Sequence, residues 1–107
     1  MKKSLFYPYY AMLKSKPKFE LGITLFTEGA WKLVENDCIF VNEIDACFER
    51  YIHKDLGVLG EDNGDGYVYE VKDGEEILGM YPTSKGHICI CTSYDRKTTL
   101  IFLSSER

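Results

Sequence analysis

The sequence predicts an α+β domain in which an antiparallel sheet of three to five strands is covered by one main helix and one short helix. The first supporting observation is the segment from Glu75 to Ser104, where three runs rich in β-branched and aromatic residues are separated by short polar breaks at residues 84–86 and 95–97. Strand-like runs joined by such short turns are typical of an antiparallel meander.

The second observation is a helical stripe in the middle of the chain. Five apolar residues recur at the spacing i, i+3, i+4, i+7, i+8: Ile44, Cys47, Phe48, Tyr51 and Ile52. This spacing places them on one side of a helix. Asn42, followed three residues later by Asp45, resembles a capping box. We therefore expect a helix from Glu43 to His53 that covers one face of the sheet.

The segment before this helix predicts one strand and one short helix. Phe19 to Phe26 has the composition of a first strand. Thr27 is a favourable N-cap, and an acidic residue such as Glu28 suits the first turn of a helix. The apolar side of this helix comprises Ala30, Leu33 and Val34, with Trp31 beside them, and we expect it to end near Asn36-Asp37.

The first 18 residues differ in composition from the rest of the chain. All 17 acidic residues follow Phe19, whereas the arm from Met1 to Lys18 carries lysines and aromatic residues. Its lysines are Lys2, Lys3, Lys14, Lys16 and Lys18. We divide the chain into this basic aromatic arm (1–18) and a single domain (19–107). The arm packs Phe6 and Tyr7 on the domain or, alternatively, binds single-stranded nucleic acid by charge and stacking.

The segment from Asp55 to Gly74 is rich in glycine and acidic residues. Tyr67 to Val71 alternates enough for a short strand, and Asp73-Gly74 suits a turn. In the meander that follows, both alternating faces are apolar, so one helix leaves the second face without a cover. The arm, the first helix or a second subunit, in a homodimer, could supply that cover.

Length and composition indicate one folded domain. A 107-residue chain with 45% hydrophobic residues can form a core without metal or disulfides. No apolar run is long enough to span a membrane, and the N-terminal segment is a poor signal peptide. We therefore expect a cytoplasmic protein without a membrane partner.

We expect the four cysteines, Cys38, Cys47, Cys89 and Cys91, to be free thiols that are mostly buried.

No residue pattern carries a recognisable catalytic signature. His87, Cys89 and Cys91 alternate along one predicted strand and could contribute to a zinc site, but no paired Cys-x-x-Cys motif accompanies them. The loop from Glu61 to Gly66 resembles the start of a calcium loop, yet Lys72 stands where the bidentate glutamate is needed. Apolar surroundings make the cysteines poor nucleophiles for His53 or His87 to activate. We expect no cofactor, no metal and no enzymatic activity.

Several short motifs lie between Gly22 and Glu106. They are Gly29-Ala30, His53, Gly57, Gly60, Glu61, Asp62, Tyr81, Gly86 and the turn Asp95-Arg96-Lys97-Thr98-Thr99. In this combination the chain resembles a family of small, largely uncharacterised bacterial proteins of plasmids and other mobile elements, although that family has Trp where Leu59 stands. The resemblance implies an α+β fold and a mobile-element origin, and it implies no catalytic residues.

Charge segregation suggests a function. Asp55 to Glu76 contains eight acidic residues and a single lysine, Lys72. Such a surface suits a basic groove on another protein. We expect a non-enzymatic protein of a mobile element that binds a host protein, for example a defence nuclease. The expected contact residues are Asp62, Asp65, Asp73, Glu76, Asp95 and Arg96. The alternative is a nucleic-acid-associated protein that uses the lysines of the arm.

Overall fold

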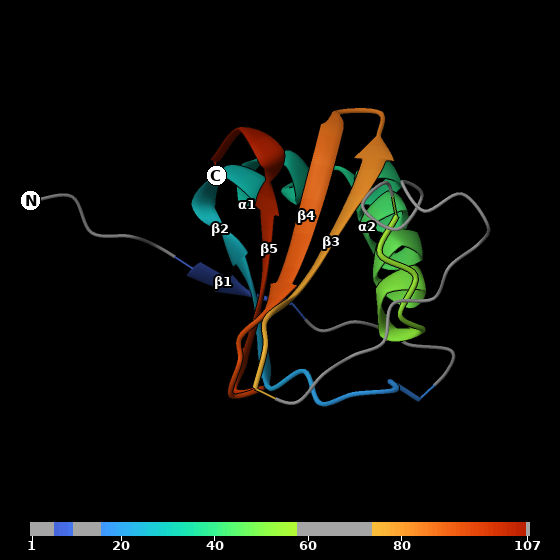
Figure 1. Ribbon diagram of the computed structural model, residues 1–107. Helices are drawn as coiled ribbons and strands as arrows, with labels where there is room; N and C mark the ends of the chain where they lie inside the picture. Colours follow the sequence, from blue (N-terminus) through green and yellow to red (C-terminus); the bar gives the residue numbers. More distant parts are fainter. Residues whose placement is uncertain (1–5, 10–15, 58–73, 107) are drawn as a thin grey trace, which may run out of the picture.

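The computed structural model describes residues 6–9, 16–57 and 74–106 (Figure 1). The elements are β1 (Phe6–Pro8), β2 (Ile23–Thr27), α1 (Glu28–Val34), α2 (Cys38–Ile52), β3 (Ile77–Thr83), β4 (Gly86–Thr92), β5 (Thr98–Leu103) and a 3₁₀ turn, η1 (Ser104–Glu106). The described strands form one five-stranded sheet in the order β1-β2-β5-β4-β3. The predicted α+β class and the C-terminal meander are therefore confirmed.

Three of the four strand pairings follow the predicted antiparallel pattern, and one departs from it. β3 pairs with β4, β4 with β5, and β1 with β2, all antiparallel. β2, however, runs parallel to β5, with Ile23 opposite Thr98. Parallel strands need a long connection, and the chain between β2 and β5 provides one, since it contains both helices and the first two strands of the meander. β2 also begins at Ile23, later than the predicted Phe19.

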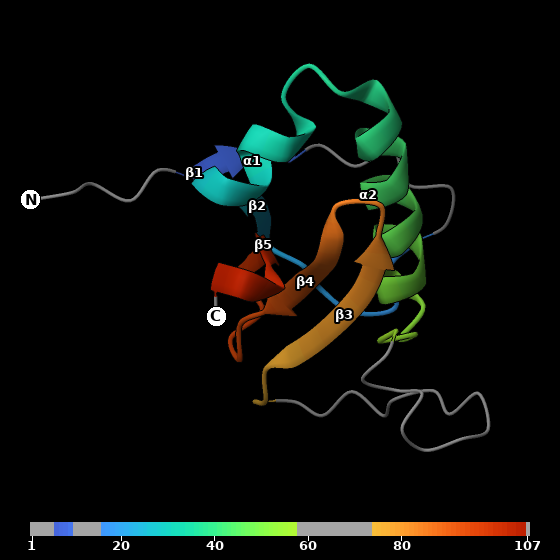
Figure 2. The ribbon, with the colours of Figure 1, turned by 90° about the horizontal axis from the view of Figure 1, so that it is seen from above.

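Both helices lie on the same side of the sheet (Figure 2). The core forms between them and the inward side chains of the strands. From α2 it takes Ile44, Phe48 and Ile52, all at most 1% exposed, and from the sheet it takes Ile90 and Ile101, which are fully buried. The predicted apolar stripe of the main helix is thus its buried face.

The prediction for the start of α2 was wrong. The helix begins at Cys38 rather than at Glu43, because Asp37 is its N-cap: the Asp37 side chain accepts a hydrogen bond of 3.0 Å from the Phe40 amide. Phe40 is 1% exposed and extends the stripe by one turn, since it lies four residues before Ile44. Asn42, the predicted cap, lies inside the helix.

The short helix α1 matches its prediction closely. Thr27 caps it, with its hydroxyl oxygen accepting a hydrogen bond of 3.2 Å from the Ala30 amide. Ala30 and Val34 are buried, as the spacing indicated. The helix ends at Val34, and Asn36 adopts a left-handed conformation with φ of 61°, which Asn tolerates better than most residues.

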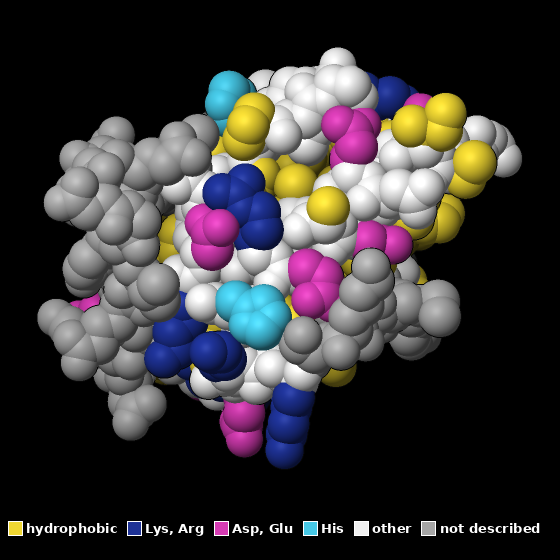
Figure 3. All heavy atoms as spheres, turned by 90° about the vertical axis from the view of Figure 1, so that its right-hand side faces the viewer, with side chains coloured by type: hydrophobic (Ala, Val, Ile, Leu, Met, Phe, Trp, Pro, Cys, Tyr) yellow, Lys and Arg dark blue, Asp and Glu magenta, His cyan; other side chains and the backbone are white. Residues whose placement is uncertain are grey.

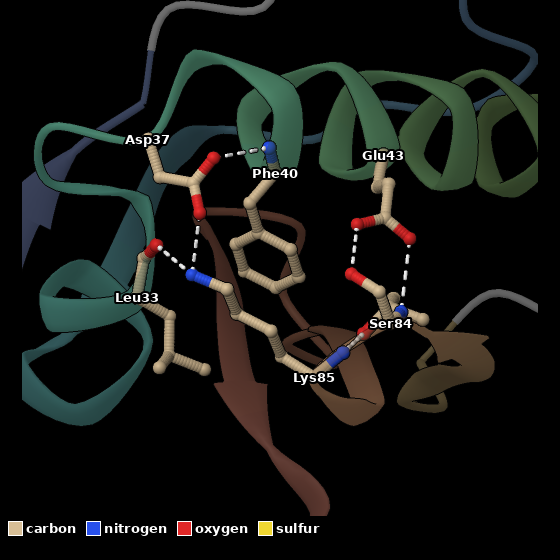
Figure 4. Close-up of polar contacts among 7 residues, drawn as sticks. Leu33, Asp37, Phe40, Glu43, Ser84 and Lys85 are labelled. Atoms are coloured by element: carbon tan, nitrogen blue, oxygen red, sulfur yellow. Dashed lines mark hydrogen bonds and ion pairs between the residues drawn. The ribbon is translucent and has the colours of Figure 1, made fainter.

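The tip of the β3–β4 hairpin is fastened to the helices (Figure 4). Lys85 forms an ion pair of 2.6 Å with Asp37 and donates to the Leu33 carbonyl at 3.2 Å. The Glu43 carboxylate accepts hydrogen bonds from the amide and the hydroxyl of Ser84. These bonds lower the pKa of Asp37, chiefly through Lys85, and that of Glu43, chiefly through the Ser84 hydroxyl. We call Leu33, Asp37, Glu43, Ser84 and Lys85 together the hairpin end.

The second face of the sheet carries apolar side chains of intermediate exposure: Leu78, Met80, Cys91, Leu100 and Phe102. α1 does not cover this face, because it lies on the same side as α2 (Figure 2). β1 does not cover it either, because β1 is the edge strand of the sheet. Along the described stretches, no helix has both the length and the apolar character needed to cross a membrane.

Candidate functional site

The structure describes some of the predicted contact residues. Glu76 immediately precedes β3, while Asp95 and Arg96 lie in the turn between β4 and β5. Asp62, Asp65 and Asp73, the calcium-like loop and the predicted strand Tyr67 to Val71 lie outside the described residues. Among the lysines of the arm, Lys16 and Lys18 are described, whereas Lys2, Lys3 and Lys14 are not.

The β4–β5 turn is held by its own polar groups. Asp95 accepts hydrogen bonds from the Ser93 hydroxyl at 2.7 Å and the Lys97 amide at 3.1 Å, and these bonds lower its pKa. Arg96 is left-handed, with φ of 61°. Its guanidinium donates to the carbonyls of Ser93 and Glu75, the first at 2.9 Å. Arg96 therefore ties the turn to the residues that enter β3.

The structure brings the basic arm to the same turn. A hollow of about 580 Å³ is lined by Lys16, Pro17, Lys18, Phe19, Glu20, Leu21, Gly22 and Arg96. Gly22 permits this approach: its φ is +64°, and a Cβ there would lie 2.1 Å from the Lys97 carbonyl oxygen. We call residues 16–22, 75–76 and 93–97 together the charged end. The arm and the turn are far apart in the sequence, and Gly22 is the one local signal of the contact between them.

Charges are mixed on the face that Figure 3 shows, where lysine and arginine side chains lie among aspartates and glutamates. On α2 and just after it, Arg50 binds Asp55 with two hydrogen bonds, the shorter of 2.8 Å, which lowers the pKa of Asp55. On α1, Lys32 lies 3.7 Å from Glu28. The described residues carry twelve acidic and eight basic side chains, and the segment between Gly57 and Gly74 adds five acidic residues and one lysine, so each contributes a formal net charge of −4.

The cysteines are free thiols, as predicted, but fewer are buried than expected. Cys47 and Cys89 are buried, Cys91 is half-buried and Cys38 is exposed. Burial raises the pKa of Cys47 to about 11, so this thiol stays protonated at neutral pH. Among the described residues, no group of three or more His, Cys, Asp or Glu side chains is placed to hold a metal ion.

A second concave surface was not foreseen from the sequence. It is a groove of about 830 Å³ between β1, α1 and the first half of α2. Trp31 stacks on Tyr7 with ring centroids 4.9 Å apart, and Tyr9 donates a hydrogen bond to Asp45. Burial and this hydrogen bond raise the pKa of Tyr9. The aromatic residues of the arm were the available signal, but their pairing with β2 depends on contacts distant in sequence.

No protein-family model, curated protein or solved structure matches this chain. The resemblance to mobile-element proteins therefore stays an expectation based on short motifs.

Proposed function

We propose that this protein is a small, non-enzymatic, cytoplasmic interaction protein of a mobile genetic element. Its partner is a host protein with a basic groove, such as a defence nuclease. The contact is made by the acidic segment from Asp55 to Glu76 together with the β4–β5 turn. Within this region the proposed contact residues are Asp62, Asp65, Asp73, Glu76, Asp95 and Arg96.

The observation that carries this proposal is the junction made by Arg96. Its guanidinium donates a hydrogen bond to the Glu75 carbonyl, so the end of the acidic segment lies against the turn that presents Asp95. The lowered pKa of Asp95 favours its ionised form. Glu76 follows Glu75, and Asp95 precedes Arg96, so our proposal assigns both acids to the surface that a basic partner would meet. Charge complementarity of this kind speeds association and selects partners.

The alternative function is association with nucleic acid, and one observation favours it. Lys16, Lys18 and Arg96 line the same hollow, although Glu20 also lines it. Phosphate groups bind such clusters through charge, with a strong dependence on salt. Deleting the arm would not be a clean test, because β1 lies within it and pairs with β2. Replacing Lys2, Lys3, Lys14, Lys16 and Lys18 by glutamine leaves the strand in place.

The test is a capture experiment from bacterial lysate with three forms of the protein. The first is the wild type, and the second carries Asp62→Asn, Asp65→Asn, Asp73→Asn and Glu76→Gln. The control removes acidic charges outside the proposed contact and outside the hairpin end, with Glu28→Gln, Glu35→Gln and Glu49→Gln. We expect a protein that the wild type and the control retain and that the acidic-segment variant loses.

Two results would contradict this proposal. One is equal capture of the same protein by the acidic-segment variant and the wild type. The other is capture of nucleic acid alone, lost at raised salt and lost in the variant with five glutamines in place of lysines. The second result would establish the alternative function.

A further inference from the structure

The groove between β1, α1 and α2 is a separate concave surface from the charged end. Its described lining comprises Tyr7, Pro8, Tyr9, Phe26, Trp31, Val34, Glu35, Asn36, Val41 and Asp45. Phe26 and Val34 are buried, at 3% and 5% exposure. The side walls come from β1 on one side and from both helices on the other.

Aromatic rings give the groove flat apolar walls. Tyr7 and Trp31 are stacked, with an angle of 11° between their planes. Tyr9 meets Phe26 edge to face at a centroid distance of 5.1 Å and Phe48 at 5.3 Å. Each ring is therefore fixed by another ring, so the walls are ordered before any ligand arrives. A preordered aromatic surface binds with a smaller loss of side-chain entropy.

The charge at the groove is acidic. Glu35 is exposed at the end of α1, and Asp45 projects from α2. No lysine, arginine or histidine is among the described residues that line the groove, and none in the described part of the chain forms an ion pair with either acid. Asp45 accepts a hydrogen bond from Tyr9 instead. A ligand with a positive charge would complement these two carboxylates.

The backbone of β1 offers little for an added strand. The Tyr9 amide donates to the Thr24 carbonyl, so in this antiparallel pair Tyr7 and Tyr9 point their amides toward β2. Phe6 and Pro8 face the free edge, and Pro8 has no amide hydrogen. At this edge of β1 the Phe6 amide is the one donor, and the carbonyls of Phe6 and Pro8 are acceptors. So short an edge with a single donor gives an added strand little pairing, and we expect side chains to dominate the recognition of a bound segment.

We propose that this groove is a docking site for an extended, proline-containing peptide segment that carries an arginine or a lysine. Polyproline segments are rigid, need no backbone pairing and fit aromatic-lined grooves. The prolines pack on Tyr7, Tyr9 and Trp31, and the basic side chain binds at Glu35 and Asp45. This site is independent of the acidic segment and of the proposed function.

Trp31 makes the proposal directly measurable, because it is the single tryptophan of the chain. The probe is the synthetic peptide Pro-Leu-Pro-Arg-Pro-Leu-Pro, titrated into the full-length protein while tryptophan fluorescence is recorded. We expect a saturable change. The same peptide with glutamate in place of arginine should bind more weakly, as should one with its prolines replaced by glycine and serine.

Two variants locate the basic side chain. Glu35→Gln should weaken binding of the arginine peptide by about two- to fivefold, the range of an exposed ion pair. It should leave binding of a peptide with glutamine in place of arginine unchanged. Glu28→Gln, at the opposite end of α1 and outside the groove lining, is the matched control and should have no effect on either peptide.

Four results would overturn the proposal: no saturable fluorescence change, equal binding of the glutamate and arginine peptides, equal binding of the glycine-serine peptide, or no effect of Glu35→Gln. Sedimentation velocity provides a further check. If the protein alone dimerises and dilution to monomer changes Trp31 fluorescence, a second copy occupies the groove and the peptide assignment is wrong.

Discussion

The two ends of the sheet use charged side chains in different ways. At the hairpin end, Lys85 meets Asp37, and Glu43 meets the polar groups of Ser84, so opposite groups from different elements face one another. At the charged end, Arg96 donates to the backbone carbonyls of Ser93 and Glu75 and lines one hollow with Lys16 and Lys18. The first arrangement joins side chains of different elements, whereas the second joins a side chain to the backbone.

The largest expected effect comes from breaking the backbone contact at the charged end. Gly22→Ala places a methyl group 2.1 Å from the Lys97 carbonyl oxygen in a left-handed conformation. We expect a loss of about 3 kcal/mol or more in the free energy of unfolding, measured with urea. Gly74 also has a positive φ but open space around it, so Gly74→Ala should lose only about 1–2 kcal/mol. Equal losses would show that the contact with Lys97 is unimportant.

A buried row of hydroxyl groups connects the charged end to the core. Thr99 donates to the Leu21 carbonyl at 2.6 Å and lies 2.8 Å from Thr92, which lies 2.7 Å from Tyr51. Tyr51 in turn donates to the Ile77 carbonyl at 2.9 Å. The three hydroxyls together have three hydrogens but make four contacts. Because both end groups are carbonyl acceptors, one of the two hydroxyl–hydroxyl contacts is left without a hydrogen.

This shortage predicts different costs for two similar substitutions. Thr99→Val leaves the Leu21 carbonyl without its donor and should lower the free energy of unfolding by about 1–3 kcal/mol. Thr92→Val removes one hydrogen and two contacts, so each carbonyl keeps a donor, and it should cost less than about 1 kcal/mol. Urea denaturation of the two variants measures the difference. A larger loss from Thr92→Val would refute this account of the network.

The smallest effect is expected from the ion pair of the hairpin end. Lys85→Met should lower Tm by about 2–6 °C at neutral pH, because it removes the partner of Asp37. The pKa of Asp37 is held below its ordinary value of 3.8, so this contribution is present above that pH and disappears as pH falls through the lowered pKa. The difference in Tm between wild type and variant should therefore shrink in acid.

Lys97→Met is the matched control, because Lys97 lies at the charged end and its side chain is exposed. We expect it to change Tm little at any pH. If the two lysine variants lose the same stability, the contrast between the two ends is wrong.

Local patterns predicted the meander, the short helix and the buried stripe of α2, because each depends on residues close in sequence. The cap at Asp37 was missed because the run from Cys38 to Val41 reads equally well as a strand. The parallel pairing of β2 with β5 and the approach of Lys16 to Arg96 depend on distant contacts. The sequence around these contacts gives little sign of them. Ile23, at the start of β2, is 67% exposed, so it does not belong to an apolar pattern, and Gly22 is one glycine among nine.

The parallel pair also has a kinetic consequence. Joining β2 to β5 closes a loop that contains both helices and two strands, and the entropy lost is offset only when the helices pack on the sheet. The meander, by contrast, pairs segments that are neighbours in sequence and should form early. We therefore expect the docking of β2 to be the slow step of folding. Substitutions in the residues that pair β2 with β5 should alter the folding rate more than substitutions in the β3–β4 turn.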